Sequence, residues 1–439
     1  MSREPGDDAM EPPPRPFKNA DLCTHCGYCL PVCPTYRVDN DETESPRGRV
    51  SIVLALASGT LTLEEATTAL SRCLLCRACH KACPAGVRPA KLALLARNQQ
   101  PLPSTAASRL LHRITDSPAL TALAARWLSR YQASGLQQRI RRGSLLPRFP
   151  ALARLEALLP SFRPGETIPE RLPPPGPSLR EQPRVALLAG CMARLFYPRI
   201  APSLENLLTL GGCEVVVLRG FGCCGAPYRE AGDRNRFLRQ ARRTLDAFIA
   251  AGRVDAIVCD SAICAVTAGG YARSLAEDPH YREPARAFSS KLVDLNRLLL
   301  SRLAAREISF GVPDTPSAVY HDHCQTRFGL GIMEEPRKLL ALLPIEHREV
   351  ARTESQVSCC GAGGEYRLRH PERSQAIGAL KLETLLATGA ECIVASNPGC
   401  MLHLEAGARQ AGLPVRVIHL AELLWTAVLN SPDKKWGKK

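Results

Sequence analysis

The sequence predicts an α+β chain of several domains, in which a helical N-terminal domain precedes two copies of an α/β unit. Three observations predict this. Two cysteine runs of identical spacing lie within residues 17–100, among stretches of helical character. After residue 183, short β-rich runs alternate with longer helical segments, which is typical of βαβ units around a parallel sheet. The cysteines of this second part recur at a nearly fixed offset, which indicates an internal duplication.

Length and composition agree with several folded domains. A chain of 439 residues is long enough for about three units. Hydrophobic residues make up 45% and charged residues 23%, as in globular proteins. Residues 1–16 are polar and proline-rich, without the apolar stretch of a secretion signal, so we expect a disordered tail and a cytoplasmic protein. No apolar run approaches the roughly 18 residues that a membrane-spanning helix needs.

Changes of composition along the chain suggest the domain boundaries. The expected units are the tail at 1–16, the cysteine-run domain at 17–100, a helical basic segment with a proline-rich linker at 101–183, and two repeats at 184–304 and 316–425. Helices are expected at 118–132 and 234–252, and strands at 185–191, 214–220 and 256–261.

One stretch carries much of the net charge of +15. Residues 101–180 contain twelve arginines and no lysine against four acidic residues, a surplus of eight positive charges. This stretch is either a solvated basic face or a docking surface for an acidic partner subunit or for anionic lipid headgroups, which would give peripheral membrane association. Because no nucleic-acid-binding motif accompanies it, we expect no nucleic-acid partner.

The two cysteine runs have the spacing that binds [4Fe–4S] clusters. The first is Cys23-x2-Cys26-x2-Cys29-x3-Cys33-Pro34, and the second repeats it with Cys73, Cys76, Cys79, Cys83 and Pro84. In the bacterial ferredoxin pattern, three cysteines of one run hold one cluster and the fourth holds the other. We therefore expect two clusters with crossed ligands, namely Cys23, Cys26, Cys29 and Cys83 for one and Cys73, Cys76, Cys79 and Cys33 for the other.

Zinc and disulfides explain the runs less well. Zinc is usually held by two CxxC pairs, which leaves the twice-repeated spacing without a reason. In a reducing compartment, clustered cysteines are more often metal ligands than disulfides. Pro34 and Pro84 each lack an N–H and are expected to stop a helix at that point. Gly27 allows the backbone to pass close to sulfur.

Matched cysteines recur in the second part of the chain. The offset from Cys191 to Cys324 is 133 residues, and the other matched cysteines differ by 136. The two sets are Cys191, Cys223, Cys224 and Cys264, then Cys324, Cys359, Cys360 and Cys400. Since the carboxyl ends of parallel strands are where such sheets bind ligands, each set is expected to hold a further cluster or a redox-active thiol group. The alternative is that they are buried core residues, as we expect for Cys213, Cys259 and Cys392.

These motifs resemble the iron–sulfur subunit of glycolate oxidase (glycolate dehydrogenase) over about residues 17–425. The resemblance rests on LCTHCGYCLPVCPTYR, SPRGR at 45–49, RCLLCRACHKACPAGV, GFGCCGAP, SCCGAGGEY and NPGCMLHL. The repeats with their CCG motifs are also similar to those of heterodisulfide reductases, the anaerobic glycerol-3-phosphate dehydrogenase C subunit and lactate-utilisation proteins. In heterodisulfide reductase the repeat ends in a CxxC pair. Ser261 and Asn397 stand here at the earlier place of that pair, so the five-thiolate cluster of that enzyme lacks one thiolate.

The resemblance implies an electron-transfer subunit of a flavin-dependent 2-hydroxy-acid dehydrogenase for glycolate or D-lactate. It implies FAD on partner dehydrogenase subunits, a quinone-type acceptor, and a place in the cytoplasm or on the cytoplasmic face of the inner membrane. The chain has no GxGxxG or P-loop motif and no acid/base constellation, so we expect no catalytic residue in it. The alternatives are a heterodisulfide-reductase-like thiol/disulfide reductase, the iron–sulfur subunit of a glycerol-3-phosphate or lactate dehydrogenase, and a structural zinc protein.

Overall fold

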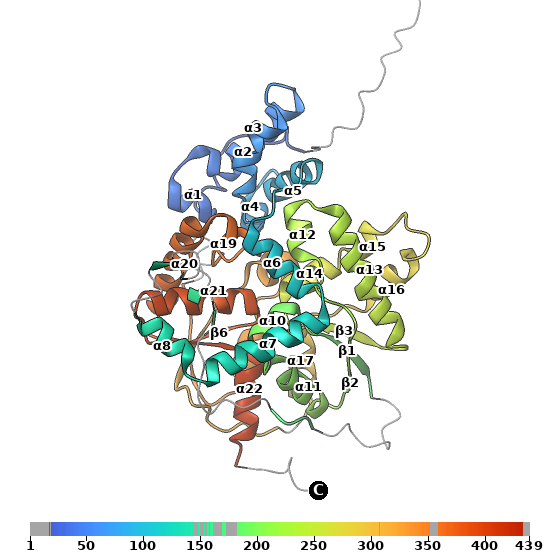
Figure 1. The fold of residues 1–439 in the computed structure, drawn as a ribbon, viewed down its shortest axis with the longest axis vertical. Helices are drawn as coiled ribbons and strands as arrows, with labels where there is room; N and C mark the ends of the chain where they lie inside the picture. Colours follow the sequence, from blue (N-terminus) through green and yellow to red (C-terminus); the bar gives the residue numbers. More distant parts are fainter. Residues whose placement is uncertain are drawn as a thin grey trace, which may run out of the picture.

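The computed structural model describes residues 17 and 19–432, except for 144–147, 150–152, 154–155, 158, 161–168, 173–181, 307 and 352–358. The expected tail at 1–16 and most of the expected linker at 163–183 lie outside the described residues. The described chain forms a helical N-terminal domain, a helical segment and two α/β units (Figure 1). The α+β fold that the sequence predicts is therefore confirmed.

The N-terminal domain consists of short helices around the two cysteine runs. They are α1 (Pro34–Asp39), the 3-10 helix η1 (Glu42–Glu44), α2 (Pro46–Ala57), α3 (Leu63–Ser71), α4 (Ala78–Ala82) and α5 (Pro89–Gln99). The Ser45 side chain caps α2 by accepting from the Gly48 N–H, and Thr62 and Glu65 form a capping box at α3. Our expectation for Pro34 was wrong, since α1 begins at this residue. The fixed φ of proline suits the first turn of a helix, where no N–H is needed.

The basic segment is helical and lies on the repeats. Its helices are α6 (Ala106–Thr115), α7 (Pro118–Ala133) and α8 (Leu136–Arg142). The helix expected at 118–132 is thus present as α7. Helices α6 and α7 pack on α10 (Cys191–Phe196), and in Figure 1 they cross the front of the molecule in cyan. This segment is therefore a cover over the place where the repeats meet.

Both repeats contain a parallel sheet with their first strand at its centre. In the first repeat, β1 (Arg184–Leu188), β2 (Glu214–Val217) and β3 (Ala256–Cys259) are ordered β2-β1-β3. In the second, β4 (Ser317–Tyr320), β5 (Glu346–Arg348), β6 (Cys392–Ala395) and β7 (Arg416–His419) are ordered β5-β4-β6-β7. The βαβ units that the alternating pattern predicts are confirmed, and the second repeat adds one strand.

Helices flank the two sheets. In the first repeat they are α10, α11 (Ile200–Leu210), α12 (Ala226–Ala231), α13 (Arg234–Ala250), α14 (Ala262–Ala268), α15 (Tyr271–Ser274), α16 (Arg282–Lys291) and α17 (Leu295–Ala304). In the second they are the π-helix η3 (Gln325–Leu330), α18 (Glu335–Leu340), α19 (Tyr366–Arg369), α20 (Pro371–Leu386), α21 (Pro398–Gln410) and α22 (Leu420–Leu429). None of the described helices is long and apolar enough to span a bilayer.

The two repeats share one hydrophobic core. Leu187 of β1 and Leu204 of α11 belong to the same buried cluster as Ile393 of β6 and Leu424 of α22, and all four are 0% exposed. Helices α11 and α22 pack directly on each other. Because neither repeat could expose this core to water without a large hydrophobic cost, the two behave as one structural body.

Candidate functional site

The eight cysteines of the two N-terminal runs gather around two small spaces. One cavity of about 20 Å³ is lined by Cys23, Cys26, Cys29 and Cys83. A second, also of about 20 Å³, is lined by Cys33, Cys73, Cys76 and Cys79. Each space thus takes three cysteines from one run and the fourth from the other, which is the grouping expected for crossed ligands. Among the described residues, no three of these eight sulfurs lie within 4.8 Å of one another, so the sulfurs stand apart around each space.

The backbone makes the same left-handed turns in both runs. His25 and Gly27 have φ of 54° and 87°, and Leu75 and Arg77, two and four residues after Cys73, have φ of 52° and 68°. A positive φ is uncommon for residues other than glycine. The matched turns curl each run so that three sulfurs face one space.

The two thiol groups differ in their access to solvent. Cys26 is exposed, whereas Cys33, Cys76 and Cys79 are buried. Burial raises the pKa of the Cys29 thiol to about 11 and the pKa values of Cys76 and Cys79 well above their ordinary value. These thiols keep their protons at neutral pH until a bound metal ion displaces the protons. One group therefore lies at the surface and the other in the interior.

The SPRGR segment places an arginine beside the inner thiols. The Arg49 side chain, 3% exposed, pairs with Glu44 at 2.7 Å and donates to Thr35 Oγ1 at 3.0 Å and to Cys33 Sγ at 3.8 Å. Burial alone would lower the pKa of Arg49, but the negative charges of Cys73, Cys33 and Glu44 outweigh it and the pKa is raised. Arg49 thus puts a fixed positive charge beside the inner group. Sequence reasoning used SPRGR only as a mark of resemblance and missed this role.

Another buried arginine, Arg97 of α5, ties the N-terminal domain to the first repeat. It donates to the carbonyl oxygens of Leu70 and Cys73, each at 2.6 Å, and to the carbonyl oxygen of Glu230 at 2.9 Å. The Gln325 amide of the second repeat donates to the Leu75 carbonyl oxygen at 3.1 Å. Polar contacts therefore hold the second cysteine run against both repeats.

The matched thiols of the repeats lie where the sequence places them, at the carboxyl ends of the strands. In each repeat one thiol begins the helix after the central strand, the CCG pair follows the second strand, and the last thiol lies in the helix after the third. Cys224 Sγ lies 3.0 Å from Cys264 Sγ, and Cys360 Sγ lies 3.0 Å from Cys400 Sγ. The structure thus brings together both expected sets.

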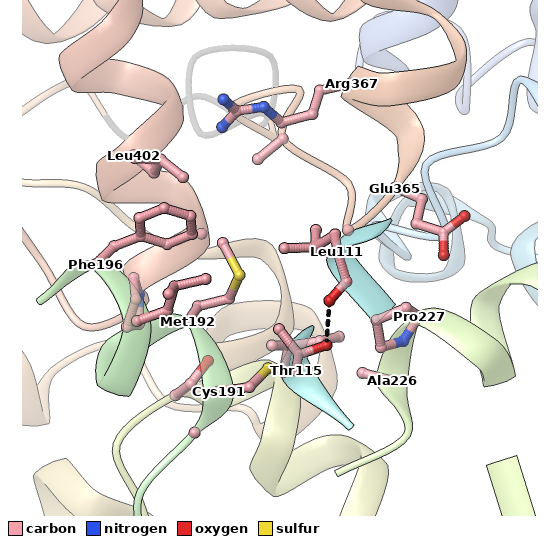
Figure 2. Close-up of a pocket in the computed structure, with 18 of the residues that line it drawn as sticks. Leu111, Thr115, Cys191, Met192, Phe196, Ala226, Pro227, Glu365, Arg367 and Leu402 are labelled. Carbon is pink, nitrogen blue, oxygen red and sulfur yellow. Dashed lines mark hydrogen bonds between the residues drawn. The ribbon is translucent and has the colours of Figure 1, made fainter. Parts of the chain in front are cut away.

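All eight repeat thiols line one cavity of about 660 Å³ between the two repeats. Figure 2 shows Leu111 and Thr115 of the cover in this cavity, facing Met192 and Phe196 of α10. On the other side lies Glu365, which pairs with His112 and with Arg369. Burial opposes the charge of Glu365, but these hydrogen bonds outweigh it and its pKa is lowered. The sequence did not indicate that the two thiol sets share a cavity.

Ser261 and Asn397, at the places of the missing thiolates, meet across the two repeats. The Ser261 hydroxyl donates to Asn397 Oδ1 at 2.5 Å, and Asn397 Nδ2 donates to Cys400 Sγ at 3.4 Å. Of the remaining cysteines, Cys213 and Cys392 are 0% exposed and Cys259 is 3% exposed, and all three belong to the hydrophobic clusters. They occupy the core positions that we expect for them.

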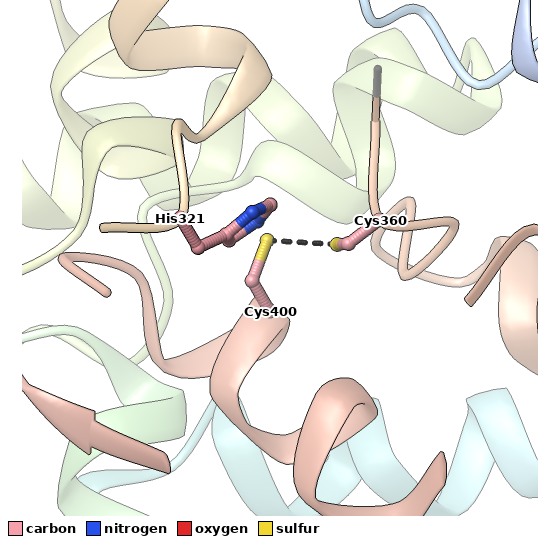
Figure 3. A group of neighbouring side chains, drawn as sticks. All are labelled: His321, Cys360 and Cys400. Atoms are coloured by element: carbon pink, nitrogen blue, oxygen red, sulfur yellow. Dashed lines mark hydrogen bonds between the residues drawn. The ribbon is translucent and has the colours of Figure 1, made fainter. Parts of the chain in front are cut away.

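The second cysteine run adjoins the thiols of the second repeat. Cys76 packs in one buried cluster with Cys324 and Cys359. His321, three residues before Cys324, is also buried beside the thiols Cys360 and Cys400 (Figure 3). Sequence reasoning missed His321, although a residue-by-residue comparison of HDHC (321–324) with LAGC (188–191) could have found it.

Comparisons with known proteins agree with this architecture. The "4Fe-4S dicluster domain" family matches residues 19–87, and the "Cysteine-rich domain" family matches 185–268 and 318–405. The probable glycolate oxidase iron-sulfur subunit of Bacillus subtilis is 35% identical over 92% of this chain and 93% of its own length. The chain belongs to the glycolate oxidase iron–sulfur subunit family. The glycolate oxidase iron-sulfur subunit of Escherichia coli is 29% identical over 88% of the chain and 90% of its own length.

A shorter relative shares only part of the chain. Lactate utilization protein A of Halalkalibacterium halodurans is 26% identical over 55% of this chain and 96% of its own length. As a glycolate oxidase iron–sulfur subunit homologue with a dicluster domain, the chain is an iron–sulfur protein with a role in electron transfer. The name "subunit" places its relatives in an assembly, and glycolate oxidase is an oxidoreductase.

Proposed function

We propose that the chain is the electron-transfer subunit of a flavin-dependent 2-hydroxy-acid dehydrogenase that oxidises glycolate or D-lactate. Electrons would pass from FAD on partner subunits, through this chain, to a quinone-type acceptor. The observation that carries the proposal is a succession of neighbouring thiol groups. The outer group, with the exposed Cys26, shares one hydrophobic cluster with Cys73 and Cys79 of the inner group. Cys76 of the inner group packs with Cys324, which lines the cavity between the repeats.

The N-terminal thiols fit two [4Fe–4S] clusters. Four sulfurs surround each space. Burial raises the pKa of Cys29, Cys76 and Cys79, and a bound metal cation would supply the positive charge that stabilises their thiolates in these sites. We assign Cys23, Cys26, Cys29 and Cys83 to the outer cluster and Cys33, Cys73, Cys76 and Cys79 to the inner one. When bound, such clusters supply one-electron transfer. The repeat thiols are proposed as further iron–sulfur or redox-active sites.

The residues of this chain set the order and environment of the sites. Cys26 at the surface is suited to receive electrons from a partner, and the crossed ligands keep the outer and inner clusters adjacent. Arg49 would stabilise the added negative charge of a reduced inner cluster, because its guanidinium lies next to the ligand Cys33. Buried Arg97 holds the inner run against the repeats, so that electrons continue towards Cys324.

The outer face of α7 supports peripheral binding to an anionic bilayer. Leu123 and Trp127 are 51% and 62% exposed on this helix, and Arg126 and Arg130 flank them on the same exposed side. The Arg130 guanidinium lies 5.8 Å from the centre of the Trp127 ring. An exposed tryptophan among aliphatic and cationic side chains is typical of a membrane interface. Other residues of α7, namely Ala124, Leu128 and Tyr131, line the thiol-lined cavity, so a lipid-soluble acceptor at this helix would lie next to it.

Vesicle flotation tests the membrane surface. We expect the chain to float with vesicles that contain phosphatidylglycerol and not with pure phosphatidylcholine. Replacing Arg126 and Arg130 by Glu should abolish flotation, because it reverses the attraction for the anionic headgroups. Arg253→Glu, a charge reversal at an exposed arginine outside the cover, is the matched control and should float normally. Equal flotation of both variants would contradict a role for α7 and favour a face that docks a protein partner.

The quinone-reductase activity of the complete complex tests the proposed function. We expect Cys26→Ala and Cys76→Ala together to lower the rate of quinone reduction at least about 100-fold, while glycolate still reduces FAD, because only the route after the flavin is cut. Cys213→Ala changes a buried cysteine outside every set and should leave the rate within about twofold. Quinone reduction at the full rate in the double variant would refute the proposal.

A thiol/disulfide reductase is the second candidate, because two pairs of repeat thiols lie only 3.0 Å apart beside a large cavity. This function predicts that the chain alone reduces a disulfide when it is supplied with a low-potential electron donor. Robust turnover of that kind would replace the first proposal, whereas no turnover by an iron-loaded chain would eliminate this second candidate.

A further inference from the structure

In the second repeat, a histidine stands with two of the matched thiols as a compact group. One ring nitrogen of His321 and the sulfurs of Cys360 and Cys400 all lie within 4.8 Å of one another. Figure 3 shows the imidazole ring beside both sulfurs. The three residues come from separate elements: His321 follows β4, Cys360 lies in the loop before α19, and Cys400 lies in α21. Among the described residues, this is the one group of three or more His, Cys, Asp or Glu found at such spacing.

The spacing fits ligands that share one metal atom. A tetrahedral metal about 2.3 Å from two thiolates and about 2.0 Å from an imidazole nitrogen brings the three donor atoms to roughly 3.5–3.8 Å from one another. Cys360 Sγ and Cys400 Sγ lie 3.0 Å apart, so each sulfur needs to move by less than about 1 Å to reach that geometry. The ligands of a cubane each bind a different iron and stand farther apart, and no three of the N-terminal thiols form a group within 4.8 Å.

Both ring nitrogens of His321 are available to bind a metal. The residue is 0% exposed, and neither Nδ1 nor Nε2 has a hydrogen-bond partner among the described residues. Leaving a buried polar group without a partner is unfavourable, so a ligand for these nitrogens is expected. Neutral imidazole is a good ligand for iron and zinc, and a bond to the metal would supply the missing partner.

The first repeat has no equivalent of this nitrogen. With the offset of 133 residues, His321 corresponds to Leu188 at the end of β1. With the offset of 136 residues, Lys381 of α20, 2% exposed, corresponds to Leu245 of α13. The charges of Cys360 and Cys400 act on Lys381, so this ammonium lies in the same surroundings. The replacement of a leucine by His321 and of another by Lys381 thus adds two nitrogen-bearing side chains near the thiols of the second repeat, and the first repeat has neither.

We propose that His321 is a metal ligand in the second repeat, bound to the same iron as Cys360 and Cys400, whereas the first repeat binds iron through sulfur only. The choice of iron rests on the proposed function. A histidine in place of a thiolate raises the reduction potential of an iron–sulfur centre, as in Rieske proteins. The centre of the second repeat would therefore attract electrons from the inner cluster, whose ligand Cys76 packs against Cys324 and Cys359.

Pulsed EPR on the complete, iron-loaded chain labelled with ¹⁵N-histidine tests the proposal. The spectra are recorded through a stepwise redox titration, without glycolate, quinone or partner subunits. The wild-type chain should show strong ¹⁵N coupling to one paramagnetic iron centre. His321→Leu, which installs the residue of the first repeat, should lose this coupling together with part of the bound iron. His321→Cys should keep the iron, lose the coupling and titrate at a lower potential.

A nearby histidine provides the matched control. His403 is buried in the same repeat, but its Nε2 lies 3.0 Å from the Ser374 carbonyl oxygen, so His403→Gln should keep the coupling. Absence of histidine coupling in the fully loaded wild type, its persistence in both His321 variants, or stoichiometric zinc in place of iron would overturn the proposal. Because the measurement involves no substrate or acceptor, failure of the quinone assay would leave its result intact.

Discussion

Replacing Arg49 by Gln should lower the reduction potential of the inner cluster. The Arg49 guanidinium lies 3.8 Å from Cys33 Sγ, and a metal–sulfur bond adds about 2.3 Å, so the charge stands about 6 Å from the nearest iron. At an effective dielectric constant near 20, a unit charge at that distance stabilises one added electron by about 3 kcal/mol. For a one-electron couple this corresponds to roughly 120 mV.

The neighbouring charges reduce this value. Glu44 pairs with Arg49 at 2.7 Å and cancels part of its field at the cluster. Glu44 also contacts Arg72 at 2.5 Å and Arg373 at 3.8 Å, so its carboxylate stays paired in the variant. We therefore expect the midpoint to fall by about 50–120 mV. Gln keeps a polar side chain at the position, which limits the structural cost.

An EPR-monitored redox titration measures the midpoint, with iron content confirming that both clusters are present. Arg49→Lys is the matched control, because it keeps the positive charge and should shift the midpoint much less than Arg49→Gln. A midpoint that stays within about 20 mV or rises in Arg49→Gln would refute the electrostatic reasoning. An equal fall in both variants would show that the geometry of the guanidinium, and not its charge, sets the potential.

Two further predictions concern the stability of the chain and its iron content. Burial lowers the pKa of His419 from 6.5 to about 4, so this residue is neutral in the folded chain while the unfolded chain takes up a proton below pH 6.5. Its contribution to stability is therefore lost as the pH falls from 6.5 towards 4. The wild-type free energy of unfolding in urea falls between pH 7.5 and 5.5, and His419→Gln should make this fall smaller by about 1.4 kcal/mol. A fall of the same size in His419→Gln and the wild type would contradict this assignment. A Cβ on Gly48 would lie 1.9 Å from the Glu42 carbonyl oxygen, so Gly48→Ala should displace the start of α2 and lower the iron content. Gly59→Ala is the control, because no atom lies within 4 Å of a Cβ at this position. This variant should pay only the strain of its φ of 76° and keep its iron. Equal iron content in the Gly48 and Gly59 variants would show that the turn before α2 adapts to the added Cβ.

Sequence patterns predicted those features that depend on neighbours along the chain. The alternation of β-rich and helical segments predicted the parallel sheets, and the helix expected at 234–252 is present as α13, Arg234–Ala250. Pro34 shows the limit of such reasoning. Proline is compatible with either the stop or the first turn of a helix, and only the path of the following residues selects the first turn.

Features that depend on distant residues needed the structure. The SPRGR segment does not reveal that Arg49 is buried against Cys33, because the contact requires α2 to pack beside the inner thiols. The shared cavity requires the two repeats to join through α11 and α22. His321 becomes a candidate ligand only when the loop of Cys360 and the helix of Cys400 are brought to the same strand end.

The sequence by itself determined the chemistry that each segment can offer. Spacings of two and three residues between cysteines set how far a run can curl, and the matched offsets set which thiols correspond in the two repeats. Tertiary structure decided which thiols meet, which are exposed, and which charged or nitrogen-bearing side chains stand beside them. The physical reason is that local spacing is fixed by the covalent chain, whereas burial and electrostatic environment depend on packing between residues hundreds of positions apart.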